Sequence, residues 1–145
     1  MRFHFLGGRI VIPVLQPSLV QTDGSFRKGV GRIAVLLHHD SRVFSKVATI
    51  PQIRDSYEAE WASVYNGILF SLHHNAHSIH LENDNFGVIT NLLSNSSSKT
   101  KKQYVNYYRN AIVDIVHKSD YVGIRWIPRS KNRADDLFRS NKLSS

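Results

Sequence analysis

The sequence predicts an α/β domain in which a mixed five-stranded sheet is flanked by helices. Three strand-like segments follow one another between residues 18 and 50, which is the pattern of an antiparallel meander. Segments with helical spacing then alternate with two short strand-like segments, as in parallel strands joined by crossover helices. The predicted order is βββ-α-β-α-α-β-α. Pro17 separates an N-terminal arm or extra strand, residues 1–17, from one domain over residues 18–145.

The composition fits one soluble domain with an anionic partner. The chain has 145 residues, enough for one sizeable core, and 41% of them are hydrophobic. It has no cysteine, which excludes disulfides and thiolate metal sites and fits an intracellular compartment, the cytoplasm or nucleoid. The longest apolar run, Ile10–Leu15, is too short to cross a bilayer, so we expect no membrane partner. A formal net charge of +8 favours nucleic acid.

The first three strands are predicted from their apolar patterns. Leu19–Thr22 is the first strand, and we expect it to end at Asp23 and Gly24, where the glycine lets the chain turn or lets a ligand come close. Arg32–Leu37 contains a continuous apolar run, which is typical of a strand buried on both faces. Arg42–Ile50 alternates loosely and is the third strand. Together they form the expected meander.

The rest of the chain is predicted to supply the helices and two further strands. A capping box, with Asp55 as the N-cap and Glu58 three residues later, begins a helix that runs to about His74. The later elements are, in chain order, a strand at Ser78–Leu81, a helix at Phe86–Leu93, a helix marked by Tyr104 to Val116, a strand at Tyr121–Ile127 and a helix from Ala134 to about Lys142. Trp61 and Trp126 fall on core-facing patterns, and we expect both to be buried.

Four carboxylates fall where strand ends and helix starts can meet at one edge of the sheet, namely Asp23, Glu60, Asp84 and Asp135. Each alone has a structural explanation, such as a turn, a solvated helix face, a helix cap or a dipole partner. Together they would repel one another, and divalent cations are the simplest way to hold them. Oxygen-only ligand sets suit Mg²⁺ or Mn²⁺. Two such ions about 3.5–4 Å apart can activate water and stabilise the leaving oxygen in phosphodiester cleavage.

Over roughly Ser18 to Phe138 the chain resembles the ribonuclease H type 1 family and the related RNase H domains of reverse transcriptases and retrotransposons. The motifs that carry the resemblance are Thr22-Asp23-Gly24-Ser25, Ala59-Glu60-Trp61 with Gly67-Ile68, Asn83-Asp84-Asn85, and the closing segment Ile127–Leu137. The resemblance implies an RNase H-like fold. It also implies that Asp23, Glu60, Asp84 and Asp135 are catalytic and hold two Mg²⁺ ions, with Mn²⁺ as a possible substitute.

The closing motif departs from the family pattern, because the spacing from Asn132 to Ala134 is one residue shorter than in cellular ribonucleases H. Counting from Asn132 selects Asp136 as the fourth ligand, whereas counting from Ala134 selects Asp135. A helical step of about 100° separates the two neighbours, so only one of them can face the site. We prefer Asp135, and Asp136 stays open as the alternative.

The resemblance also implies residues that assist catalysis or contact the substrate. The loop before the last helix lacks the histidine of many bacterial members, and Arg129 is expected to take part of its role electrostatically, because arginine stays protonated. The expected substrate contacts are Gly24, Ser25, Ser56, Asn85, Lys101 and Lys102. The two lysines belong to a basic loop that would stand in for the family's basic protrusion. Asp55 would repel a phosphate, which favours its interpretation as a cap.

The function implied by the resemblance is that of an endonuclease, acting as a monomer, that hydrolyses the RNA strand of RNA–DNA hybrids and leaves 5′-phosphate and 3′-hydroxyl ends. Two alternatives stay open. One is a DNA nuclease with the same fold, of the resolvase or integrase kind. The other is a non-catalytic module that binds hybrid or RNA. Cleavage of hybrid against duplex DNA separates the first alternative, and metal dependence separates the second.

Overall fold

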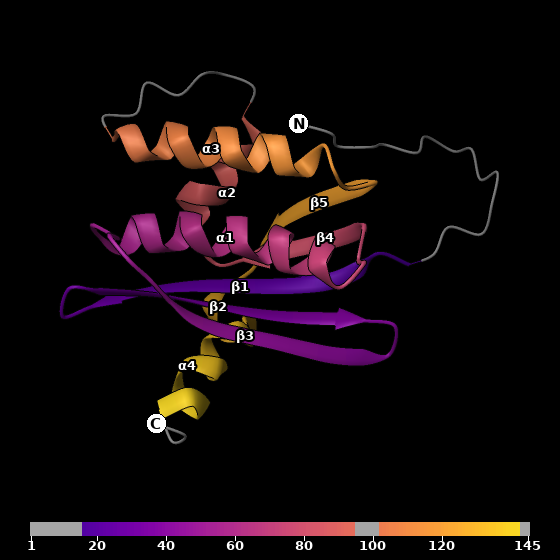
Figure 1. The fold of residues 1–145 in the computed structure, drawn as a ribbon, viewed down its shortest axis with the longest axis horizontal. Helices are drawn as coiled ribbons and strands as arrows, with labels where there is room; N and C mark the ends of the chain where they lie inside the picture. The colour runs from indigo at the N-terminus through magenta and orange to yellow at the C-terminus, as the bar shows by residue number, and fades with distance from the viewer. Residues whose placement is uncertain (1–15, 95–101, 143–145) are drawn as a thin grey trace.

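The computed structural model describes residues 16–94 and 102–142 and arranges them as one five-stranded sheet with helices on both faces (Figure 1). The elements in chain order are β1 (Ser18–Arg27), β2 (Val30–His39), β3 (Arg42–Ile50), α1 (Ser56–His73), β4 (Ser78–Asn83), α2 (Phe86–Leu93), α3 (Gln103–Val116), β5 (Tyr121–Trp126), the short 3-10 helix Arg129–Lys131 and α4 (Ala134–Lys142). The α/β class and the predicted order of elements are confirmed. Among the described helices, none combines the length and the apolar character needed to cross a bilayer.

The sheet has the strand order β3-β2-β1-β4-β5, so β1 is its central strand. β1, β2 and β3 pair antiparallel, as the predicted meander requires, whereas β4 is parallel to β1 and β5 is parallel to β4. The pairing of β1 with β4 ends at Thr22 opposite Asn83. Asp23 and Asp84 are the next residues after Thr22 and Asn83. The parallel register therefore sets these two carboxylates side by side at the point where β4 leaves the sheet.

β1 is longer than the sequence predicted. Asp23 lies in the middle of the strand, because β1 stays paired with β2 as far as Arg27 after β4 has left. The turn comes at Lys28-Gly29, where φ is 52° and 76°. Two successive positive φ values are those of a two-residue hairpin loop whose twist matches the strands. The expected turn at Asp23 and Gly24 is thus wrong, and the site residue stands on a continuous strand.

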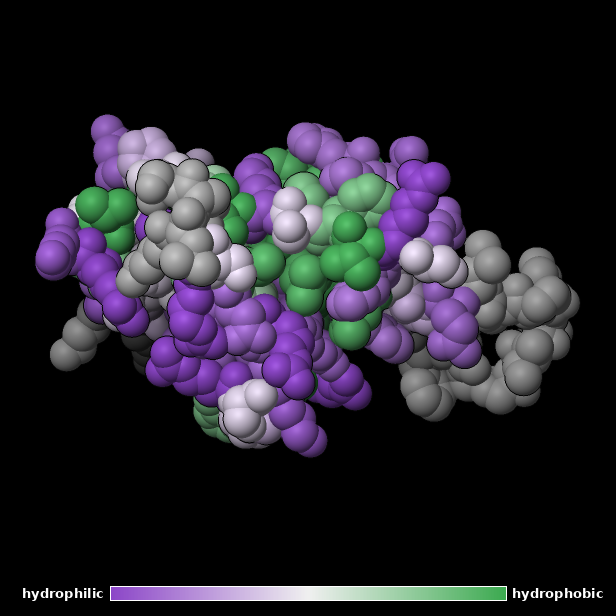
Figure 2. All heavy atoms as spheres, turned by 90° about the horizontal axis from the view of Figure 1, so that it is seen from below, coloured by the Kyte–Doolittle hydropathy of each residue, from purple (hydrophilic) through white to green (hydrophobic). Residues whose placement is uncertain are grey.

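The helices cover the two faces of the sheet unequally. Figure 1 shows α1, α2 and α3 on one face, where the main core includes Val20, Ile33, Trp61, Ile68 and Leu81. The other face carries α4 over a small cluster of Ala34, Ala134 and Phe138. Figure 2 views the molecule from the α4 side, where an apolar area lies beside hydrophilic surface. The larger core thus fixes α1 against the central strand, and α4 reaches the sheet from the opposite side.

The two tryptophans have different environments. Trp61 is fully buried, as predicted. The prediction for Trp126 is wrong, because 43% of its surface is exposed. It is the last residue of the edge strand β5, where no neighbouring strand covers it. Its indole Nε1 donates a hydrogen bond to the Asp84 carbonyl oxygen over 3.0 Å, and its ring meets the Phe86 ring edge-on.

Candidate active site

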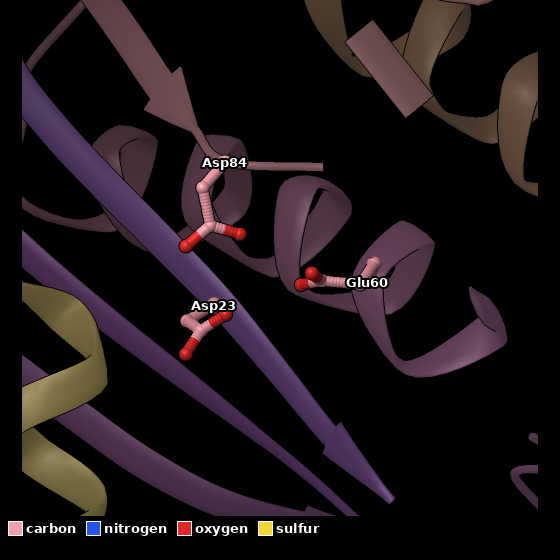
Figure 3. Close-up of side chains that lie close together, drawn as sticks. All are labelled: Asp23, Glu60 and Asp84. Atoms are coloured by element: carbon pink, nitrogen blue, oxygen red, sulfur yellow. The ribbon is translucent and has the colours of Figure 1, made fainter. Parts of the chain in front are cut away.

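Three carboxylates from different elements converge at the centre of the sheet. Asp23 comes from β1, Glu60 from α1 and Asp84 from the position directly after β4 (Figure 3). Each offers an oxygen, and these oxygens lie within 4.8 Å of one another. Within the described residues, no other group of three or more acids or histidines lies this close together. The structure therefore brings together three of the four acids that the sequence singled out.

Gly24 explains how Glu60 reaches Asp23. A Cβ atom at Gly24 would lie 2.4 Å from the carbonyl carbon of Ala59, so only glycine lets α1 approach β1 this closely. The Gly24 backbone N–H donates to Glu60 Oε1 over 2.6 Å. This glycine therefore serves close packing between helix and strand, together with an anchor for the Glu60 carboxylate.

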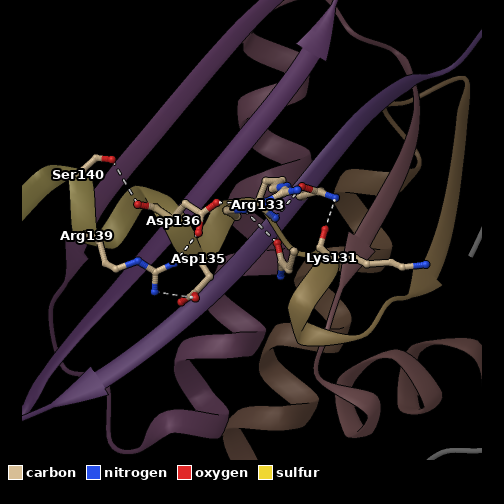
Figure 4. A network of polar contacts seen from close by, with 9 residues as sticks. Lys131, Arg133, Asp135, Asp136, Arg139 and Ser140 are labelled. Atoms are coloured by element: carbon tan, nitrogen blue, oxygen red, sulfur yellow. Dashed lines mark hydrogen bonds and ion pairs between the residues drawn. The ribbon is translucent and has the colours of Figure 1, made fainter.

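Asp135 faces the same site from α4. It lines a cleft of about 410 Å³ together with Asp23, Glu60 and Asp84. The neighbouring Asp136 does not line this cleft; it pairs with Arg139 and Arg133 (Figure 4). The Asp135 side chain is 20% exposed and the Asp136 side chain 50%. The geometry thus places Asp135 against the other three acids, while its role as a ligand stays a prediction.

Burial and mutual repulsion shift the pKa values of the clustered acids upward. Burial is the main cause for Asp23, and the nearby Glu60, Asp84 and Asp135 raise its pKa further, to about 9. Burial and then Asp84 raise the pKa of Glu60 to about 7. Burial also raises the pKa of Asp84, although a hydrogen bond from Asn132 and the charge of Arg129 oppose this. At neutral pH the cluster therefore cannot carry its full negative charge unless positive charge is supplied.

Two side chains before α4 connect the closing segment to the cluster. Asn132 is buried, and its Nδ2 donates to the Thr22 carbonyl oxygen over 2.9 Å and to Asp84 Oδ2 over 3.2 Å. Arg129 lines the cleft and lowers the pKa of Asp84 through its charge. The structure therefore sets Arg129 where the sequence expected it, near the acids and facing the same space.

The predicted substrate contacts fall into three groups. Gly24, Ser25 and Ser56 line the cleft. Asn85 caps α2, accepting from the Val88 N–H over 3.0 Å, and its hydrogen bond also lowers the pKa of Glu60. Lys102 lies outside the cleft, and Lys101 falls outside the described residues. Their contacts with substrate stay predictions.

Lys102 belongs to a second, larger pocket of about 850 Å³ between the starts of α1 and α3. Its Nζ lies 2.8 Å from Asp55 Oδ2, and the Tyr104 hydroxyl donates to Asp55 Oδ1 over 2.7 Å. Asp55 also caps α1, accepting from the Glu58 N–H over 2.8 Å, as the capping box predicted. The other acid of this pocket, Glu58, pairs with Arg54, whose Nη1 lies 3.2 Å from Glu58 Oε2. Asp55 and Glu58, the paired acids, therefore already have partners within the chain, so the size of this pocket does not make it the centre of the chemistry.

Two buried polar residues behind the cleft were not singled out from the sequence. Gln21 and Glu82 lie two residues before Asp23 and Asp84, and Gln21 Nε2 donates to Glu82 Oε1 over 2.8 Å. Residues two apart on a strand point to the same face. The signal was therefore in the sequence, since Asp23 and Asp84 are each preceded at this spacing by another polar residue.

Comparison with known proteins gives a family and a fold. A family model described as reverse transcriptase-like matches residues 21–139. The RNase H1 of the halophilic archaeon Halobacterium salinarum superposes with a TM-score of 0.74 at 21% identity, covering 83% of this chain and 93% of that one. The N-terminal RNase H domain of a Mycobacterium tuberculosis protein gives a TM-score of 0.72 at 16% identity, covering 88% and 97%. A further RNase H1, LC11, solved in complex with an RNA/DNA hybrid, gives 0.72 at 19% identity, covering 88% and 99%.

No curated protein sequence matches the chain. The structural likenesses, all at low sequence identity, establish the RNase H fold. The mixed sheet, its strand order and the helices around it agree with that fold.

Proposed function

The chain belongs to the reverse transcriptase-like family of RNase H-like domains, and from that membership we propose that it is a metal-dependent endonuclease hydrolysing the RNA strand of RNA–DNA hybrids. The observation that carries the proposal is the meeting of Asp23, Glu60 and Asp84 within 4.8 Å, on a chain of net charge +8. A buried group of like charges costs stability, and strongly shifted pKa values in a cleft mark functional sites. The basic surroundings suit a polyanionic substrate.

The donor set fits divalent cations of the Mg²⁺ type, because all its ligand atoms are carboxylate oxygens. Asp23, Glu60, Asp84 and Asp135 would hold two such ions, with Mn²⁺ as a substitute. Bound ions supply the positive charge that lets water attack the phosphodiester and lets the 3′ oxygen leave. The raised pKa values of Asp23 and Glu60 fit this interpretation, since binding would then displace protons from the cluster.

The remaining cleft residues would orient the substrate. Arg129 faces the cleft with a permanent positive charge, which suits contact with a phosphate but not proton abstraction. Ser25 and Ser56 bring hydroxyl groups to the cleft from β1 and from the start of α1. Hydroxyls can accept from or donate to a ribose 2′-hydroxyl, which is the group that distinguishes RNA from DNA. These side chains therefore support an RNA-containing substrate.

The hybrid is favoured over the other substrates by one comparison, since LC11 RNase H1 has been solved with an RNA/DNA hybrid. The test is cleavage of a hybrid labelled on either strand, with Mg²⁺ and with chelator, beside matched double-stranded RNA and duplex DNA. We expect metal-dependent cutting of the RNA strand of the hybrid alone, with 5′-phosphate products. Cutting of duplex DNA would replace the proposal with a DNA nuclease. Salt-sensitive binding without cutting, in Mg²⁺ and in Mn²⁺, would replace it with a binding module.

A further inference from the structure

We propose that Gln21 and Glu82 form a buried clamp that fixes the segment between β5 and α4 and thereby positions Asp135 against Asp23. The inference rests on the proposed function only in taking Asp135 as a metal ligand. Neither clamp residue lines the cleft, so both act as positioning residues. The clamp lies on the same sheet face as Asp23, because Gln21 precedes Asp23 by two residues in β1 and Glu82 is paired opposite Gln21 in the parallel register.

Gln21 contacts both sides of the clamp with a single amide group. The side chain is 6% exposed. Its Nε2 donates to Glu82 Oε1 over 2.8 Å and to the Lys131 carbonyl oxygen over 3.2 Å. Its Oε1 accepts from the Arg133 backbone N–H over 3.0 Å. One side chain thus ties β1 to β4 and holds the closing segment at two backbone positions just before α4.

Glu82 fixes the orientation of that amide. It is 5% exposed, and its second oxygen accepts a hydrogen bond from Arg125 on β5. Both carboxylate oxygens of Glu82 accept hydrogen bonds, one from Gln21 Nε2 and one from Arg125, so Glu82 faces the NH₂ end of the Gln21 amide. The oxygen end then points to Arg133, where an N–H donor is required.

Asn132 holds the same segment from the side of the cluster. Its Nδ2 reaches Thr22 and Asp84, and its Oδ1 accepts from the Ala134 N–H over 3.1 Å. Lys131, Asn132 and Arg133 are therefore anchored in succession, directly before the first turn of α4. Asp135 is the second residue of that helix. Without the clamp, the helix start can shift relative to Asp23, so the ligand is still present but less well placed.

The test compares Gln21→Met, which keeps the length of the side chain and removes its three hydrogen bonds, with the control Ser71→Ala. Ser71 is buried in α1 and donates one hydrogen bond to the Gly67 carbonyl oxygen, remote from the clamp. Three measurements are made on each variant. They are the hydrogen exchange of residues 131–136, Mn²⁺ binding by calorimetry without nucleic acid, and the Mg²⁺ dependence and KM of hybrid cleavage. We expect Gln21→Met to speed local exchange and to weaken Mn²⁺ binding about 10- to 100-fold, as loss of a ligand-orienting partner does. The Mg²⁺ midpoint of cleavage should rise in parallel, with KM unchanged.

Ser71→Ala should move none of these values. Equal local exchange and equal Mn²⁺ affinity in wild type and Gln21→Met would overturn the inference. If Gln21→Met does not fold, Glu82→Gln carries the test, because it keeps the shape and loses the ion pair with Arg125; a smaller shift in the same direction is expected. Wild type that binds Mn²⁺ but cuts nothing would refute the proposed function alone, since exchange and Mn²⁺ binding still decide the clamp. Wild type that binds no Mn²⁺ would overturn the positioning role.

Discussion

Two groups of acids lie near the start of α1, and the chain treats them in opposite ways. Asp55 caps the helix and pairs with Lys102 and Tyr104, whose hydrogen bonds outweigh burial and lower its pKa to about 2. One to two turns further on, Glu60 faces Asp23 and Asp84, and burial with repulsion raises the pKa values of Asp23 and Glu60 to about 9 and about 7. Asp55 is neutralised by direct partners within the chain, whereas Asp23, Glu60 and Asp84 lie against one another and form no ion pair among the described residues, although arginines line their cleft.

This difference separates acids that stabilise the fold from acids that are available to bind a cation. A carboxylate with a lowered pKa adds to the free energy of unfolding at neutral pH, and one with a raised pKa subtracts from it. Pocket size points the other way, since the larger pocket, about 850 Å³, contains the paired acids and the smaller, about 410 Å³, the crowded ones. Charge that the fold does not neutralise is the better guide to the active site.

The largest expected effect comes from Asp23→Asn. The amide cannot supply the negative charge that a divalent ion requires, so cleavage of the hybrid should fall below detection while hybrid binding persists. In the absence of metal the variant should be at least as stable as wild type, because a neutral amide can be buried beside Glu60 and Asp84 without first taking up a proton. Cleavage assays, binding assays and urea unfolding with chelator check the three parts. A normal cleavage rate would contradict the assignment of the cluster as the site.

The second prediction compares neighbours in α4. Asp135→Asn should lower the cleavage rate at least about 100-fold, the scale expected when electrostatic stabilisation of a transition state is lost. Asp136→Asn removes ion pairs with Arg133 and Arg139 on an exposed helix face, so the rate should stay within a few-fold of wild type. Single-turnover cleavage of the same hybrid compares them directly. The reverse order of effects would assign the fourth ligand to Asp136.

The third prediction concerns the pH dependence of stability without metal. The folded-state pKa of Asp23, about 9, lies above its ordinary value of 3.8. Its contribution to the free energy of unfolding is therefore fully present below about pH 4 and is lost as pH rises toward 9. Glu60, with its pKa raised to about 7, adds a further loss of the free energy of unfolding as pH rises toward 7. Asp55, with its pKa lowered to about 2, contributes above about pH 4, and its contribution is lost as pH falls toward 2.

Urea unfolding with chelator should therefore show a free energy that falls between about pH 5 and pH 9, through the range where the pKa values of Asp23 and Glu60 are raised. Excess Mg²⁺ should remove most of this slope, because bound cations neutralise the ionised cluster. Asp23→Asn should flatten it in the absence of Mg²⁺. An equal slope in wild type and Asp23→Asn would mean that the cluster is not what loses stability.

The fourth prediction breaks the other group of acids. Asp55→Ala removes the N-cap of α1 and should lower the free energy of unfolding by about 1 kcal/mol, the usual cost of losing a capping side chain. Asp55→Asn keeps a capping oxygen and should cost less. Cleavage at saturating Mg²⁺ should be unchanged in both, since Asp55 does not line the cleft. A large loss of cleavage by Asp55→Asn would remove the distinction between the two groups.

Much of the fold and most of the site follow from local patterns. The meander, the capping box at Asp55 and the four acids could be predicted because each depends on residues close in sequence or on a motif with a fixed spacing. Asp23 was expected at a strand end, because nothing in a single strand shows that β1 continues beside β2 after β4 has left. Trp126 was expected in the core, because its pattern does not show that β5 is an edge strand.

The preference for Asp135 over Asp136 came from the resemblance to the family motif. Only the structure shows that the two residues have different environments. Two adjacent acids on one helix are equivalent until the helix is placed against the sheet, and that placement depends on contacts between Gln21, Asn132 and the closing segment. These contacts join residues more than 100 positions apart, as the separation of 110 between Asn132 and Thr22 shows. Long-range hydrogen bonds of this kind leave little trace in one sequence.

The smallest expected effect tests whether Lys102, the ion-pair partner of Asp55, also contacts nucleic acid. Lys102 lines the larger pocket, and its Nζ lies 2.8 Å from Asp55 Oδ2 and 5.8 Å and 5.6 Å from the ring centroids of Tyr57 and Tyr104. Lys102→Gln should weaken hybrid binding a few-fold at low salt and lower the slope of log affinity against log salt by about 1, as loss of one phosphate contact does. Lys118→Gln, an exposed lysine beyond the other end of α3, is the control and should leave the slope unchanged. If both variants behave alike, the paired group serves only the fold, and contact with the substrate is confined to the cleft of the crowded acids.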